Sequence, residues 1–151
     1  MNRFEKILGI IFLIALIFKI ANLPGGSILA TISLMSLGFI YFFGGFAFFN
    51  KIEIENIFCA KSYKGISALR MMGSIGFGLG LSQVCMGILF QLQHWQGKDI
   101  VLPVGLITVF VLSIIALVKF SRSKTTFYKA VLLRAAVIGG LGLFLLTTNL
   151  V

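Results

Sequence analysis

Side chains that could bind or react are few in this sequence, and most of them stand in two short segments with the same spacing. The segments cover residues 17–25 and 89–97, at an offset of 72 residues, and each holds phenylalanine at its second position and glycine at its last. Their polar and turn-forming residues are Lys19, Asn22, Pro24 and Gly25 in the first copy and Gln91, His94, Trp95 and Gly97 in the second.

Two interpretations fit this repeated motif. As a turn, its glycine permits backbone angles that a tight turn needs, its proline stops a helix, and its tryptophan sits at a membrane interface. As a binding site, Lys19, Asn22, Gln91 and His94 would form a polar patch near the outer surface for a lipid headgroup, a partner protein or a small solute. His94 is the one histidine of the chain and could titrate near neutral pH.

Other reactive residues do not form a catalytic set. Gln83 lies inside an apolar run, where an amide needs a hydrogen-bond partner on another helix or a place on a solute path. Cys59 and Cys85 are not a C-x-x-C pair, and no zinc-ligand spacing, carboxylate pair or phosphate-binding loop is present. We therefore predict no catalytic residue, no metal site and no cofactor.

The elements that position these residues must be membrane helices. The 151-residue chain is 59% hydrophobic and 11% charged, whereas soluble domains are about 25% charged. Its apolar runs are long and continuous, as membrane-spanning helices require. The five predicted spans run from Ile7, or from Phe4, to Ala21, from Ile28 to Phe49, from Leu69 to Leu92, from Ile100 to Val118, and from Ala130 to Leu150.

The predicted fold is an all-α membrane bundle in a single transmembrane domain, residues 1–151. It contains two direct helical-hairpin repeats, about 4–49 and 69–118, with a cytoplasmic loop at 50–68 and a fifth helix at about 130–150. Because both copies of the motif end an outgoing helix, the repeat is parallel.

Basic residues predict the orientation of the bundle. The net charge is +9, and nearly all lysines and arginines precede the first span or lie in the second and fourth connections. Basic loops stay inside, so the N-terminus is predicted to be cytoplasmic and the C-terminus periplasmic. Arg134 is expected to reach the inner boundary. Anionic lipid headgroups, rather than nucleic acid, are the expected polyanion.

Small residues predict where helices pack closely, since helices associate in lipid through glycine, alanine and serine. They recur at four-residue spacing in the third and fifth spans. The predicted packing residues are Ser74, Gly76, Gly78 and Gly80, with Ala135, Ala136, Gly139 and Gly140. These faces either hold this bundle together or dock other membrane subunits.

The motif resembles the N-terminal membrane hairpin of the L protein of the Bacteroidota gliding-motility and type IX secretion motor. Phe18, Lys19, Pro24 and Gly25 match in the first copy, and Phe90, His94, Trp95 and Gly97 match in the second. That family is understood to need an acidic residue within its membrane helices. The four acidic residues here, Glu5, Glu53, Glu55 and Asp99, fall outside the predicted spans, so the motor acid is expected to be absent.

The sequence thus favours a small non-enzymatic accessory or scaffolding subunit of a bacterial inner-membrane complex for secretion, transport or motility. Larger membrane proteins are its expected partners. One alternative is a small-solute or ion transporter or channel. Another is a membrane redox protein that resembles the DoxX-like class.

Overall fold

The computed structural model describes residues 3–50, 52, 54–57, 59–123 and 125–148. Four long helices come first: α1 (Arg3–Ile20), α2 (Gly26–Asn50), α3 (Ala68–Gln93) and α4 (Lys98–Ser123). The last helix comprises α5 (Thr126–Arg134), a π-helical turn η3 (Ala135–Gly139) and α6 (Gly140–Thr148). Two short 3-10 turns, η1 (Ile54–Asn56) and η2 (Ala60–Tyr63), lie in the long connection between α2 and α3.

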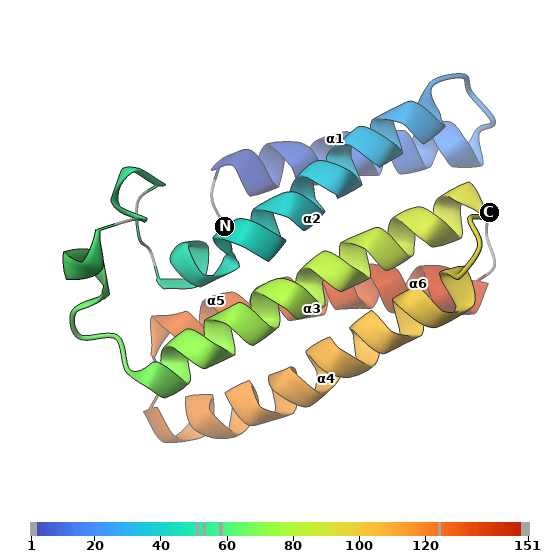
Figure 1. Ribbon diagram of the computed structural model, residues 1–151. Helices are drawn as coiled ribbons and strands as arrows, with labels where there is room; N and C mark the ends of the chain where they lie inside the picture. The colour runs from blue at the N-terminus through green and yellow to red at the C-terminus, as the bar shows by residue number, and fades with distance from the viewer. Residues whose placement is uncertain (1–2, 51, 53, 58, 124, 149–151) are drawn as a thin grey trace.

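The helices form an up-and-down bundle, which confirms the predicted all-α fold. Each helix runs antiparallel to the one before it, and the two chain ends lie toward opposite ends of the bundle (Figure 1). No strand occurs among the described residues. Lys51, Glu53, Lys124 and the last two residues of the predicted fifth span lie outside the described residues.

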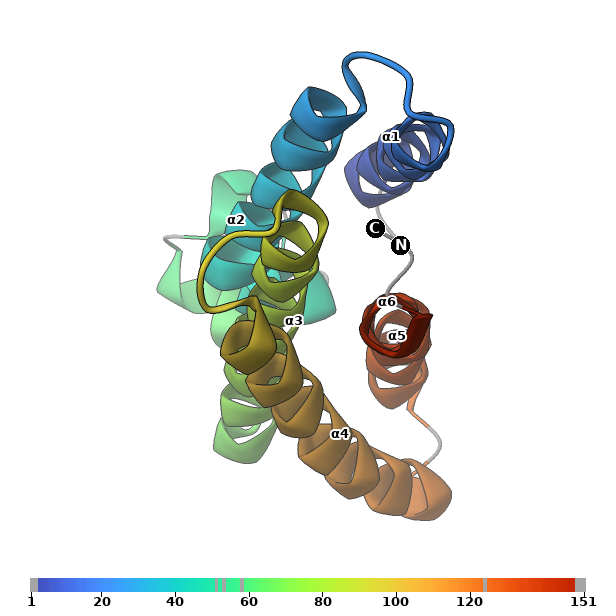
Figure 2. The same cartoon turned by 90° about the vertical axis from the view of Figure 1, so that its right-hand side faces the viewer.

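The helices pack in a curved row with two helices on one side. α2 packs between α1 and α3, and α3 packs between α2 and α4, while η3 and α6 rest on α3 and α4. Figure 2 shows α1 and the α5–α6 helix on the same side of the α2–α3–α4 row. This arrangement leaves a space between α1 and α6.

Four helices are long and apolar enough to cross a membrane: Gly26–Asn50, Ala68–Gln93, Lys98–Arg122 and Thr126–Thr148. α1 is not among them, although the first of the five predicted spans was placed there. Its 18 residues include four charged side chains, Arg3, Glu5, Lys6 and Lys19. α4 has four charged residues as well, but it is 26 residues long and keeps a long uncharged stretch between them, whereas α1 is too short to do so.

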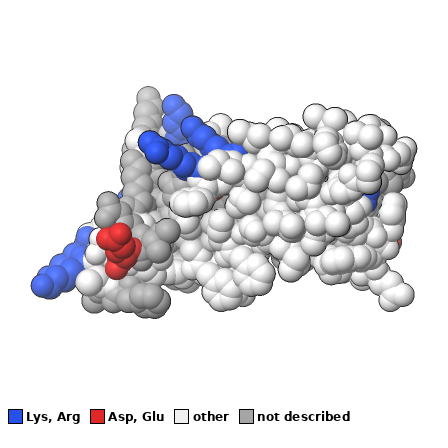
Figure 3. Space-filling view, turned by 90° about the horizontal axis from the view of Figure 1, so that it is seen from above, with Lys and Arg blue, Asp and Glu red and all other residues white. Residues whose placement is uncertain are grey.

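Charged side chains gather at one end of the bundle. Figure 3 shows lysine and arginine side chains concentrated at the end that carries the α2–α3 connection, beside a long, almost uncharged surface. Large apolar side chains are exposed along this surface, including Phe39 on α2 and Phe110 on α4, which are 58% and 66% exposed. Such a belt is solvated by lipid chains rather than by water.

The small residues of α3 pack against two different helices. Ser74 and Gly78 face α2, because Asn50 donates from Nδ2 to Ser74 Oγ at 3.0 Å and a Cβ on Gly78 would lie 2.6 Å from the Tyr41 carbonyl oxygen. Gly76 and Gly80 face α4, where their nearest atoms belong to Leu112 and to Val109. Both faces of α3 are used within the bundle.

Candidate functional site

The two copies of the turn motif adopt the same backbone geometry. Asn22 and His94 both have φ of 54°, and Gly25 and Gly97 both have φ of 90°. The amide of Leu23 bonds to the Phe18 carbonyl, as the amide of Trp95 bonds to the Phe90 carbonyl. A left-handed residue after the helix and a bond reaching back five positions close the helix end in both copies. The 72-residue repeat is thus a structural repeat.

Side chains in and beside the motif link the two turns. Lys19 Nζ donates to the carbonyl of Leu92 at the end of α3. Gln93 Nε2 donates to the Ser27 carbonyl at 2.9 Å and to Thr31 Oγ1 at 2.8 Å. These bonds connect the first turn region with the second.

The remaining motif residues divide between the interior and the surface. Gln91 is 6% exposed, and its Oε1 has no hydrogen-bond partner among the described residues. Asn22 and His94 are exposed, and so is Trp95, whose ring meets the Phe90 ring edge-on at 5.2 Å. Gln83 is partly exposed on α3, and no side-chain hydrogen bond to it is found within the described chain.

A buried ion pair joins α1 to the last helix. The Arg134 guanidinium donates from Nε to Glu5 Oε1 at 2.7 Å and from Nη2 to Oε2 at 2.8 Å. Their side chains are 5% and 1% exposed, and no other charged residue in the described chain is buried. A bidentate arginine–carboxylate contact is among the strongest hydrogen-bonded pairs, and it fixes both side chains.

Neighbouring groups complete the surroundings of the pair. Arg134 Nη1 donates to the Ala130 carbonyl at 3.2 Å, and the guanidinium lies 5.3 Å from the centre of the Phe49 ring. Tyr41 of α2 is 1% exposed and stacks on Phe49 at 6.5 Å between ring centres. The π-helical turn begins directly after Arg134, and such turns often mark functional positions in helices.

The position of this pair corrects two predictions. Arg134 does not extend into solvent, because it lies in the third turn of the last helix, which begins at Thr126, and its guanidinium is buried against Glu5. Glu5 is not in a solvated terminus, because α1 begins at Arg3 and places its carboxylate in the interior. The other described acids, Glu55 and Asp99, are exposed. The chain therefore does hold an acid inside the bundle, bonded to arginine.

The second hairpin is similar to the domain of a known family. Residues 76–132 match the GldL N-terminal domain. This GldL-like segment takes in most of α3, all of α4 and the start of α5. It confirms the resemblance to the gliding-motility and type IX secretion motor L protein at the second copy of the motif, whereas the first copy lies outside the matched segment. No curated protein and no solved structure matches the chain.

A candidate docking surface lies between the GldL-like segment and the last helix. A hollow of about 620 Å³ opens between α4 and the η3–α6 region. Its lining includes Ser113, Ala136, Gly139 and Gly140. A Cβ on Gly140 would meet no atom within 4 Å, and one on Gly139 would only reach Val109 at 4.0 Å. These small residues of the fifth helix are left open by the bundle, unlike those of α3.

Proposed function

We propose that this chain is a non-enzymatic, multi-pass subunit of a bacterial inner-membrane complex of the gliding-motility and secretion type. The observation that carries the proposal is the match of residues 76–132 to the GldL N-terminal domain. The subunit would hold a larger membrane protein in the complex. Its connections outside the bilayer are short apart from residues 51–67, so most recognition would take place between helices.

The hollow between α4 and α6 supports this role, and we expect the partner to bind there. Helices associate in lipid where small residues let backbones approach, and Ala136 and Gly140 present such a surface beside Ser113. A helix is 10–12 Å wide, so one of its turns occupies roughly 400–600 Å³, which the hollow can accommodate. We expect a transmembrane helix of the partner to pack there.

Purification of the tagged chain from its native membrane in mild detergent, followed by mass spectrometry, tests the proposed function. We expect a larger membrane protein to be recovered in stoichiometric amount. Recovery of the chain alone, or only as a homo-oligomer, would contradict the proposal. In that case the transporter alternative would take its place, and the Glu5–Arg134 pair, rather than Gln83, would be the first site to vary in flux assays.

The orientation can be tested with the two native cysteines. We propose a cytoplasmic N-terminus and a periplasmic C-terminus, because the basic residues gather at the end of the bundle that holds the α2–α3 connection. Cys59 in that connection is exposed, and Cys85 in α3 is buried. A membrane-impermeant maleimide should label Cys59 in inverted membrane vesicles and should not label it in intact spheroplasts.

Cys85 is the internal control of that experiment, since it should stay unlabelled in both preparations, and Cys59→Ser should remove the signal. Labelling of Cys59 in spheroplasts would reverse the assigned orientation.

A further inference from the structure

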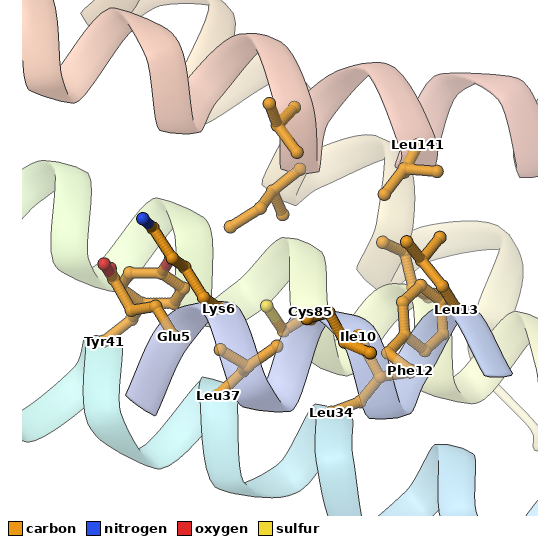
Figure 4. A pocket seen from close by; sticks show the side chains of 14 residues that line it. Glu5, Lys6, Ile10, Phe12, Leu13, Leu34, Leu37, Tyr41, Cys85 and Leu141 are labelled. Carbon is orange, nitrogen blue, oxygen red and sulfur yellow. The ribbon is translucent and has the colours of Figure 1, made fainter. Parts of the chain in front are cut away.

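A second cavity lies between α1 and the η3–α6 region, on the opposite face of the last helix from the hollow described above. Its volume is about 320 Å³, and α1, α2, α3, η3 and α6 all contribute to its wall. Figure 4 shows Glu5, Lys6 and Tyr41 at one end, with Ile10, Leu13 and Leu141 toward the other. The cavity is therefore apolar along its length and carries ionisable groups only at the end near the start of α1.

The size of this cavity decides what it can hold. It is apolar and about 320 Å³ in volume, so it can take part of an extended hydrocarbon chain, which is much thinner than a helix of about 10–12 Å diameter. An apolar cavity does not retain water, because water needs several polar partners. A hydrocarbon chain from the surrounding lipid is the occupant that fits both the shape and the lining.

The charge at the mouth indicates which lipid would supply that chain. Lys6 lines the cavity and is exposed, and Arg3 is also exposed and lies three positions away on the same face of α1. The nearest acid, Glu5, is already neutralised by Arg134. Lys6 and Arg3 therefore present a net positive charge at the headgroup end, and basic residues at a membrane surface attract anionic lipids.

We propose that this cavity is a binding site for one anionic phospholipid, whose acyl chain lies between α1 and α6 and whose phosphate is held by Lys6 and Arg3. The site goes beyond the proposed function and does not depend on it. The bound lipid fills the space left because α1 packs along α2 whereas α6 packs on α3 and α4. It also covers the apolar side of the Glu5–Arg134 pair.

Gly9 offers a direct way to block the cavity. It lines the wall, and a Cβ placed on it would meet no atom within 4 Å, so a larger side chain would enter the cavity without displacing the bundle. Gly140 is equally open but lines the other hollow instead. Gly9→Phe and Gly140→Phe are thus matched variants that each fill one space and leave the other unchanged.

The test is native mass spectrometry of the delipidated chain in detergent, titrated with phosphatidylglycerol or with zwitterionic phosphatidylcholine. The wild type and Gly140→Phe should each bind one phosphatidylglycerol per chain, more tightly than phosphatidylcholine. Gly9→Phe should lose this binding. Arg3→Gln with Lys6→Gln should bind phosphatidylglycerol about thirtyfold more weakly, since each basic group contributes about 1 kcal/mol near an anionic lipid.

Binding of phosphatidylglycerol to Gly9→Phe at wild-type strength would overturn the site. Equal binding of both lipids by the wild type would overturn the assigned headgroup contact. If Gly9→Phe does not fold, Gly9→Leu takes its place, because it fills less of the cavity and should weaken binding partially. Recovery of the protein partner is measured separately, so a failure of the lipid site leaves the proposed function standing, and the reverse also holds.

Discussion

Replacing Arg134 with leucine is expected to lower the free energy of unfolding by about 3–5 kcal/mol, because the Glu5 carboxylate would remain buried without the guanidinium. Both carboxylate oxygens of Glu5 are bonded to the guanidinium, and Glu5 is only 1% exposed. Burying a carboxylate whose cation has been removed in a lipid-surrounded interior costs free energy. Unfolding by SDS titration in mixed micelles, followed by circular dichroism, measures the change.

Two further variants separate pairing from loss of a positive charge. Arg122→Leu removes an exposed arginine at the end of α4 and should change stability by less than about 0.5 kcal/mol. Glu5→Leu combined with Arg134→Leu should recover most of the loss, because apolar replacements of a whole buried pair are often neutral or stabilising. A double variant as unstable as Arg134→Leu alone would show that the buried carboxylate left by Arg134→Leu is not the cause of the loss.

Replacing Gly87 with alanine is expected to destabilise the bundle by about 3 kcal/mol, at the upper end of overpacking costs. A Cβ at this position would lie 2.5 Å from Leu102 Cα and 2.8 Å from Leu102 N, and these are backbone atoms of α4. A backbone cannot rotate away as a side chain does, so α3 and α4 would have to separate. The same SDS titration measures the loss of stability. In hydrogen exchange, a larger fraction of the α4 backbone amides should become accessible.

Gly73→Ala is the matched control on the same helix. A Cβ on Gly73 would meet no atom within 4 Å, so the variant should gain about 0.5–1 kcal/mol from the lower flexibility of alanine in the unfolded chain. Opposite signs for the two substitutions are expected. Equal effects would show that the close approach of α3 and α4 at Gly87 does not contribute to stability.

The turns could be predicted from sequence because their determinants are local. Glycine recurs at Gly25 and Gly97 after a helix end, and both positions have the positive φ that favours glycine. The positive φ of Asn22 and His94 was harder to foresee, because both residue types are enriched in the left-handed region but neither requires it. The roles of the motif residues in binding remain predictions.

The Glu5–Arg134 pair could not be predicted from apolar runs alone. Such runs are bounded by charged residues, so Glu5 was placed before the first span although α1 begins at Arg3. The two partners are 129 positions apart and meet only through the packing of the first and last helices. One signal was available: Arg134 follows the predicted start of the fifth span at Ala130, and an arginine within a span requires an acidic partner.

The two cavities beside the last helix could not be predicted from the sequence either. Small residues at four-residue spacing in α3 and in the last helix have the same pattern, yet α2 and α4 cover those of α3, whereas Gly140 stays open. Which of these faces of small residues is buried within the bundle depends on which helices pack next to it. Ala136 and Gly140 are left available because the last helix rests on α3 and α4 at only part of its circumference.

Partner recovery from the native membrane, compared between the wild type, Gly140→Phe and Gly9→Phe, tests the subunit role most directly. The wild type and Gly9→Phe should bring down the same larger membrane protein in stoichiometric amount. Gly140→Phe should fold and insert normally but lose that protein, since phenylalanine fills the hollow between α4 and α6. Equal recovery in all three would contradict docking at this hollow, and no partner in any of them would contradict the subunit role itself.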